Sequence, residues 1–192
     1  MNIINYITEN FKARGTILEG FTRTDLAKLF SAVGFKHGAE IGVKAGVYSE
    51  ILCKSIKDLD LICVDPWVTY KAYCGVTRSK ERNNNNFHFC KKLLSPYKVK
   101  YIVKPSVEAA REVAKESLDF VYIDANHTFD HVKQDIELWS ENVRDGGIVS
   151  GHDYHETKFE EVVSAVDECL PVGARLFITD SKIPSWFFIK GE

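Results

Sequence analysis

The chain has no excess of either charge, and this absence excludes a first group of partners. Its 192 residues carry 25 lysines and arginines against 27 acidic residues, so the formal net charge is −2. A chain this close to neutrality has no global electrostatic attraction to nucleic acid or to an anionic membrane. The sequence therefore does not favour a nucleic-acid partner, although Lys91 and Lys92 could still form a local basic patch.

Long apolar runs and paired cysteines are also missing. No apolar run approaches the ~20 residues that a membrane-spanning helix needs, and the first residues lack the basic and apolar segments of a secretion signal. The five cysteines include no C-x-x-C pair, which argues against a disulfide framework or a cysteine zinc site. We therefore expect a cytoplasmic protein that has no membrane partner.

What the chain does have is an alternation of short apolar runs with longer amphipathic segments. The seven expected strands are 39–43, 59–64, 99–103, 118–123, 148–150, 174–178 and 186–189. The main expected helices are 2–11, 24–33, 47–56, 107–113, 128–139 and 157–169. Such alternation predicts an α/β fold with a mainly parallel sheet. The last two strands have only a short connection, which indicates one antiparallel strand at the end.

Residues 66–97 interrupt this alternation. The segment holds Pro66, Gly75, four consecutive asparagines and several aromatic residues, with a helix expected near 87–94. Its position after the second strand makes it a candidate substrate-gating segment over the active face. The alternative is a polar surface loop.

Polar residues follow five of the expected strands at the point where each strand ends. They are Glu40 to Gly46, Asp65 to Trp67, Pro105 and Ser106, Asp124 to His127, and Gly151 to Tyr154. In a doubly wound sheet, ligands bind outside the carboxyl ends of the strands. We therefore expect all these residues to lie at one edge of the sheet, around one ligand.

Individual residues in this set allow more than one interpretation. Gly42 and Gly46 permit a tight turn and close approach to a ligand, but their pattern is E-x-G-x-x-x-G and not the dinucleotide pattern G-x-G-x-x-G. The Asp65 carboxylate can accept hydrogen bonds from both hydroxyls of a ribose, or it can be a turn residue before proline. Trp67 could stack on an adenine ring or fill the rim of the core.

Residues 39–178 resemble the class I S-adenosylmethionine-dependent methyltransferases. The similarity to one group, related to macrolide-sugar O-methyltransferases, rests on residues 118–127, Asp135, Trp139, Gly146, Gly147 and the run Gly151-His152-Asp153-Tyr154. The resemblance implies a Rossmann-like three-layer sandwich, with a seven-stranded, mostly parallel sheet whose last strand is antiparallel. It also implies that residues 39–192 form the cofactor-binding domain. Residues 1–38 lie outside the resemblance, and because their two expected helices precede the alternating pattern, we expect them to form an N-terminal helical cap.

The same resemblance implies a set of cofactor-binding residues. They are Glu40, Gly42, Val43, Gly46, Asp65, Pro66, Trp67, Ser106, Asp124 and Ala125. Glu40, Gly42 and Gly46 would line the methionine part of S-adenosylmethionine. Asp65 would hold the ribose, and Trp67 and Ser106 would flank the adenine. The chain departs from the family at Lys44, where many members have another glycine.

Metal binding and catalysis are predicted from residues after the fourth and fifth strands. By match to metal-dependent O-methyltransferases, Asp124 and Asp153 would hold a divalent ion, with His152 beside them. Oxygen ligands suit Mg²⁺ or Ca²⁺, whereas a histidine nitrogen favours Mn²⁺ or Fe²⁺ or leaves a weaker site. His127 is the expected general base for an acceptor hydroxyl, the alternative being a solvent-exposed histidine. Asp153 could also be a simple turn residue.

The sequence thus predicts an O-methyltransferase that acts on a hydroxyl of a small molecule or sugar, with metal assistance and a histidine base. The N-terminal helices could provide a homodimer surface. Three other functions compete with this one. A nicotinamide-dependent oxidoreductase would share the sheet edge, but it would need the dinucleotide glycine pattern. A non-catalytic module that binds a cofactor or a protein would tolerate loss of Asp124 and His127. An RNA methyltransferase would need a basic face.

Overall fold

The computed structural model describes residues 2–68 and 80–192 of the chain. Its strands are β1 (Ala13–Arg14), β2 (Ile17–Leu18), β3 (His37–Ile41), β4 (Asp60–Val64), β5 (Val99–Ile102), β6 (Leu118–Ile123), β7 (Val143–Gly151), β8 (Phe177–Thr179) and β9 (Trp186–Ile189). Its helices are α1 (Ile3–Asn10), α2 (Arg23–Ala32), α3 (Val47–Ser55), α4 (Lys80–Leu93), α5 (Ser106–Ala110), α6 (Phe129–Asn142) and α7 (Glu160–Cys169). Within the described ranges, every helix is too short or too polar to cross a lipid bilayer.

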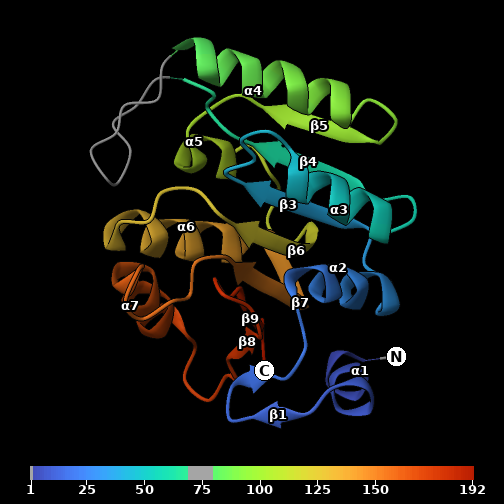
Figure 1. Ribbon diagram of the computed structural model, residues 1–192, viewed down its shortest axis with the longest axis vertical. Helices are drawn as coiled ribbons and strands as arrows, with labels where there is room; N and C mark the ends of the chain where they lie inside the picture. Colours follow the sequence, from blue (N-terminus) through green and yellow to red (C-terminus); the bar gives the residue numbers. More distant parts are fainter. Residues whose placement is uncertain (1, 69–79) are drawn as a thin grey trace.

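The strands form one nine-stranded sheet in the order β1-β2-β8-β9-β7-β6-β3-β4-β5. Figure 1 shows this order from β5 at the top to β1 at the bottom. Strands β5, β4, β3, β6 and β7 are parallel to their neighbours in this series, and β9 runs antiparallel to both β7 and β8. The predicted α/β Rossmann-like fold, with its antiparallel last strand, is therefore confirmed.

The sequence predicts seven strands, and the two additional ones form a hairpin between α1 and α2. Strands β1 and β2 pair with each other, and β2 pairs in parallel with β8. Backbone bonds extend the contact, because Ile178 N donates to Thr16 O at 2.8 Å and Asp180 N donates to Phe21 O at 2.7 Å. Strands of two residues carry no readable alternation of polar and apolar side chains, so this segment has the sequence pattern of a loop.

Buried apolar side chains form two clusters on the two faces of the sheet. One cluster joins α1, α2, α3 and α4 to the sheet, and the other joins α5, α6 and α7, which lie together on the left in Figure 1. Alternation along β6 shows the division. Phe120 and Tyr122 belong to the first cluster, whereas Val121 and Ile123 belong to the second.

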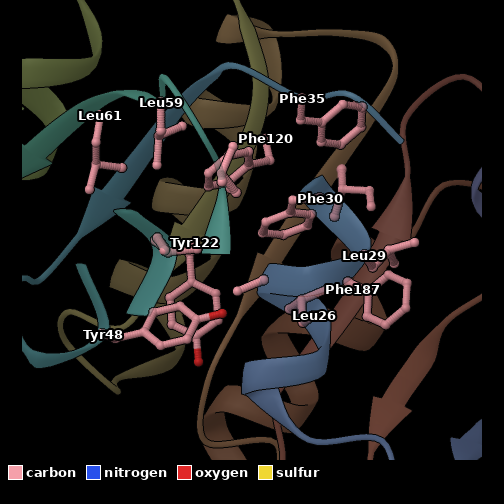
Figure 2. Packing of buried hydrophobic residues seen from close by; sticks show 14 of the residues in the cluster. Leu26, Leu29, Phe30, Phe35, Tyr48, Leu59, Leu61, Phe120, Tyr122 and Phe187 are labelled. Carbon is pink, nitrogen blue, oxygen red and sulfur yellow. The ribbon is translucent and has the colours of Figure 1, made fainter. Parts of the chain in front are cut away.

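A stack of aromatic rings fixes α2 on the first face. The Phe30 and Phe120 ring centroids are 4.2 Å apart, and Phe35 continues the stack, as Figure 2 shows. Gly38 on β3 leaves space for this stack, since a Cβ atom there would lie 2.1 Å from the Phe120 ring. A buried phenylalanine side chain contributes roughly 1.5–3 kcal/mol of transfer free energy, so the stack anchors α2 firmly against β6.

The segment 66–97 includes a longer helix than the sequence predicts. Helix α4 begins at Lys80 and ends at Leu93, and Cys90 packs into the first cluster. Residues 69–79, which carry part of the predicted substrate-gating segment and Gly75, lie outside the described residues.

Candidate active site

A cavity of about 750 Å³ lies at the carboxyl ends of the parallel strands. It is bounded by the segments that follow β3, β4, β5 and β6, as the sequence predicts for the ligand edge of the sheet. Nine of the predicted site residues line it: Glu40, Gly42, Val43, Asp65, Pro66, Ser106, Asp124, Ala125 and His127. The volume is within the usual ~300–1,000 Å³ of small-molecule sites.

The loop after β3 has the backbone shape that its glycines allow. Gly42 has a φ of +92°, and a Cβ atom there would lie 2.1 Å from the backbone oxygen of Asp124. Only glycine permits this close approach of the loops that follow β3 and β6. Lys44, which stands where many family members have glycine, adopts a φ of +56°. The local backbone course is therefore the one a glycine would take.

Asp65 holds this loop in place from the end of β4. Its Oδ2 accepts a hydrogen bond from Lys44 N at 2.8 Å, and its Oδ1 accepts one from Trp67 N at 2.7 Å. A carboxylate oxygen has more than one lone pair, so it can accept more than one hydrogen bond. The aspartate can therefore both brace the loop and accept hydrogen bonds from hydroxyl groups in the cavity.

Trp67 and Gly46 are not among the residues that line the cavity. The Trp67 ring is buried behind the loop, where its Nε1 donates to Lys44 O at 2.7 Å and its centroid lies 4.3 Å from that of Phe87 on α4. Gly46 has a φ of +79° and precedes α3, with Cys90 directly beside it. Both residues support the loop from the side facing α4.

Glu40 is a buried carboxyl at the inner wall of the cavity, with 3% of its surface exposed. The alternation of β3 directs it to the α3 side, where the Ser49 hydroxyl donates a hydrogen bond to its Oε2. Burial raises the pKa of Glu40 to about 8, although the Ser49 hydrogen bond and the charge of Arg23 oppose the shift. Glu40 is therefore mostly protonated at neutral pH when the cavity holds no cation.

This shift predicts a pH dependence of stability that the Glu40→Gln variant lacks. The Glu40 pKa is higher in the folded state than in the unfolded chain, so its contribution to stability is complete at acidic pH and is lost as the pH rises through about 8. We expect Glu40→Gln to gain roughly 3.5 kcal/mol of unfolding free energy relative to the wild type between pH 5 and pH 8. Urea unfolding of both proteins at pH 5 and at pH 8 measures this gain. If the variant and the wild type differ in unfolding free energy by the same amount at both pH values, the prediction is wrong.

A second buried carboxyl lies at the other end of the cavity. Asp135 on α6 is hydrogen bonded to Ser106, whose Oγ also accepts from Trp139 Nε1 at 2.8 Å. Burial raises the pKa of Asp135 to about 6, and the Ser106 hydrogen bond opposes this shift. Ser106 is thereby oriented at the start of α5 by two side chains from α6.

The ends of β6 and β7 bring together two aspartates and two histidines. His127 Nε2 lies 2.9 Å from Asp153 Oδ2 and 3.7 Å from Asp124 Oδ1. His152 Nδ1 lies 3.1 Å from Asp153 Oδ1 and 4.0 Å from Asp124 Oδ2. The Phe159 ring packs edge-on against the imidazole of His127, with centroids 5.1 Å apart.

Charges within this cluster set its protonation. Burial lowers the pKa of His127, but hydrogen bonds to Asp124 and Asp153 outweigh burial and bring it to about 9. Burial raises the pKa of Asp153, and the two histidines outweigh it and hold that pKa well below its usual range. At neutral pH the His127 imidazolium therefore compensates the neighbouring carboxylates.

The same cluster has the donor atoms of a metal site. One ligand atom each from Asp124, His152 and Asp153 lie within 4.8 Å of one another. Two carboxylate oxygens and one imidazole nitrogen can coordinate a divalent ion, which would compete with the proton on His127. His152 and Asp153 do not line the large cavity, but Asp124 belongs both to this cluster and to the cavity wall.

Several cavity residues are not among the site residues that the sequence predicts. They are Arg23, Ile41, Lys44, Ala45, Val47, Tyr48, Val64, Val68, Pro105, Val107, Asn126, His131, Gln134 and Asp135. Most are neighbours of predicted residues on the same loops. Asp135 stands out in the sequence only as part of the family resemblance, and Arg23 comes from α2, outside the alternating pattern.

A family model described as a methyltransferase domain matches residues 39–154. This range includes the loops after β3, β4, β5, β6 and β7, and thus every predicted site residue. No significant match is found among curated protein sequences.

Similar solved structures support the fold. A protein from Corynebacterium glutamicum is 13% identical, with 99% of this chain and 88% of that chain covered and a TM-score of 0.65. A Staphylococcus aureus protein provisionally named a caffeoyl-CoA O-methyltransferase is 18% identical, with coverages of 88% and 83% and a TM-score of 0.64. An S-adenosylmethionine-dependent O-methyltransferase from Thermotoga maritima is 12% identical, with coverages of 99% and 71% and a TM-score of 0.62.

Proposed function

Because the chain belongs to a family of methyltransferase domains, whose methyl donor is S-adenosylmethionine, we propose that it transfers this methyl group to a hydroxyl oxygen of a small molecule. The observation that carries the proposal is the grouping of Glu40, Asp65, Asp124 and His127 around one cavity. These four residues lie at the carboxyl ends of three different strands. Each supplies a group that the reaction needs, either a carboxylate for binding or an imidazole for removal of a proton.

The cofactor is assigned to the cavity by the chemistry of its walls. Asp65 accepts hydrogen bonds from the ribose, while Ser106 lies at the adenine end and Glu40, Gly42, Val43 and Ala125 lie at the methionine end. Pro66 and Asp124 complete the wall. Trp67 and Gly46 act from behind the loop, so Trp67 supports the ribose end without stacking on the adenine. This assignment is supported by the lining of the cavity and by the hydrogen bonds of Asp65.

The protein's principal task in methyl transfer is to position the acceptor. The sulfonium of the donor already activates the methyl group, so the site must hold an oxygen in line with the methyl group and the sulfur. His127 lines the cavity beside Asp124, and it is the group that removes the hydroxyl proton. Asp153 orients the imidazole through the 2.9 Å contact to its Nε2.

Metal assistance is the second part of the proposal. The donor set of Asp124, His152 and Asp153 fits a divalent ion, with Mg²⁺ suited to the oxygens and Mn²⁺ or Fe²⁺ to the added nitrogen. A divalent ion bound there would supply a positive charge, and this charge would lower the pKa of an acceptor hydroxyl and of the imidazole nearby. His127 must be neutral to accept a proton, and loss of its proton frees both carboxylates for coordination.

The acceptor is proposed to be a sugar or another small polyhydroxylated molecule. This choice rests on the resemblance of residues 118–127 and 151–154 to the macrolide-sugar O-methyltransferases. The 750 Å³ cavity and the net charge of −2 agree with a small-molecule acceptor better than with RNA. Val47 and Val68, which are 55% and 53% exposed, provide apolar surface at the rim for the rest of such an acceptor.

Calorimetric titration with S-adenosylmethionine and S-adenosylhomocysteine tests the proposed function. We expect micromolar dissociation constants for both ligands and no heat with NAD⁺, because the loop after β3 lacks the dinucleotide glycine pattern. Binding of NAD⁺ with no binding of either sulfur compound would favour an oxidoreductase instead. Binding without methyl transfer to a panel of sugars, macrolides and catechols would favour a non-catalytic cofactor-binding module.

A further inference from the structure

Arg23 brings a cation into the cavity from the N-terminal segment. It is the first residue of α2, and the capping box of Thr22 and Asp25 fixes where that helix begins. In this box Thr22 Oγ1 and Asp25 Oδ2 are 2.7 Å apart, and Asp25 Oδ2 also accepts from Thr22 N at 3.0 Å. Arg23 lies outside residues 39–154, so the matched family region does not include it.

Tyr48 holds Arg23 against the cavity wall. The Tyr48 hydroxyl donates to the backbone oxygen of Arg23 at 3.0 Å, and the guanidinium carbon lies 5.2 Å from the centroid of the Tyr48 ring. Tyr48 in turn packs on Tyr122 of β6, with centroids 4.2 Å apart, as Figure 2 shows. The Arg23 side chain is therefore oriented by Tyr48, which Tyr122 supports, and this reduces the entropy that a ligand contact would cost.

The charge of Arg23 has no ion-pair partner in the part of the chain that the structure describes. Within residues 2–68 and 80–192, no carboxylate lies within 4.0 Å of its guanidinium nitrogens. Glu40 is close enough for the charge of Arg23 to lower its pKa, but Glu40 is hydrogen bonded to Ser49. A half-buried guanidinium in a cavity is suited to a planar anion that can accept two parallel hydrogen bonds.

The position of Arg23 along the sheet indicates which anion it meets. Asp65 follows β4, and Ser106 follows β5. Arg23, in contrast, packs on Tyr48, which lies over β6, and its charge lowers the pKa of Glu40 on β3. The ribose and adenine ends of the proposed cofactor therefore lie one to three strands away from the strands nearest Arg23, β3 and β6. The group left at the Arg23 end is the amino-acid part of the cofactor, whose carboxylate is its only anionic group.

We propose that Arg23 binds a carboxylate in this cavity and that this is the α-carboxylate at the methionine end of the cofactor. The inference rests on the proposed function, because it takes S-adenosylmethionine as the ligand. It makes α2, which precedes the family-matched region, a part of the cofactor site. A carboxylate on the acceptor would have the same chemistry, and the experiment below separates the two sources.

The test compares two ligands that differ in the amino-acid part. S-adenosylhomocysteine carries the carboxylate, whereas 5′-methylthioadenosine has the same nucleoside and thioether without it. For Arg23→Gln we expect calorimetry to show a 10- to 100-fold weaker dissociation constant for S-adenosylhomocysteine, as for loss of a charge-assisted pair. The constant for 5′-methylthioadenosine should change less than threefold, and Arg23→Lys should lose less than Arg23→Gln because it keeps the charge.

Arg14→Gln is the matched control, because Arg14 is an exposed arginine of the same N-terminal segment and does not line the cavity. It should leave both constants unchanged. Equal losses for both ligands in Arg23→Gln would mean that Arg23 only supports the fold, and this would overturn the proposal. Unchanged binding of S-adenosylhomocysteine, with a raised KM for an acidic acceptor alone, would overturn the assignment to the cofactor. If the wild type binds neither ligand, the proposed function fails, and this inference fails with it.

Discussion

Replacement of Asp65 by alanine is expected to weaken the binding of S-adenosylhomocysteine about 100-fold or more. The carboxylate would accept hydrogen bonds from two ribose hydroxyls, and each bond to a charged acceptor is worth roughly 1.5–3 kcal/mol. Alanine also removes the acceptors for Lys44 N and Trp67 N, which are 2.8 Å and 2.7 Å from the carboxylate. Isothermal titration calorimetry of the wild type and the variant measures the loss.

A thermodynamic cycle separates the ribose contacts from the bracing of the loop. The second ligand of the cycle is an S-adenosylhomocysteine analogue without the 2′ and 3′ hydroxyls. We expect the wild type to bind it weakly, whereas Asp65→Ala should bind both ligands with similar weak affinity. If removal of the hydroxyls costs the variant as much as the wild type, Asp65 does not contact the ribose. Circular dichroism should confirm that the variant is folded.

His127→Ala is expected to lower the rate of methyl transfer by a factor of about 10²–10⁴, the usual contribution of a general base. Its affinity for S-adenosylhomocysteine should change less than threefold, because the proposed cofactor contacts come from other residues. The rate is measured by transfer of a labelled methyl group to the acceptor that the panel of sugars, macrolides and catechols identifies. Removal of divalent ions by EDTA should also slow the wild type, and added Mg²⁺ or Mn²⁺ should restore the rate.

Two comparisons show whether this loss is catalytic. His88→Ala is the matched control, because His88 is exposed on α4 and does not line the cavity. The His88→Ala variant should transfer the methyl group at the wild-type rate. His127→Ala also removes the imidazolium between Asp124 and Asp153, so its thermal stability should be recorded with and without Mg²⁺. A variant with wild-type turnover would exclude His127 as the base. Full activity of the wild type in EDTA would exclude metal assistance.

The central part of the fold could be predicted because its physical signals are strong. Buried parallel strands are continuous apolar runs, and the expected strands at 59–64 and 118–123 differ by at most one residue from β4 and β6. Helix α6, which follows β6, has one apolar face with Val132, Ile136 and Trp139, and the sequence shows this face directly. The hairpin of β1 and β2 could not be predicted, because its strands are stabilised by pairing with β8 and not by local sequence preference.

The candidate site was predictable wherever a residue directly follows a strand. Asp65 and Asp124 are placed at the cavity by strand order alone, since parallel strands end at the same edge of the sheet. The orientation of Trp67 depends on Phe87, a contact between distant residues that the sequence does not reveal. Arg23 belongs to a helix before β3, and long-range contacts bring that helix to the cavity, among them Phe30 on Phe120 and the Tyr48 hydroxyl on the Arg23 backbone oxygen.

The pairing of β2 with β8 has a consequence for synthesis of the chain. Strand β2 is made early and lies just before α2, whereas residues 177–179 of β8 are translated more than 150 residues later. A ribosome-bound chain can form the β3, β4 and β5 portion first, but its early hairpin must wait for a late strand. The segment that leads into α2 therefore gains its last backbone hydrogen bonds only after β8 has emerged.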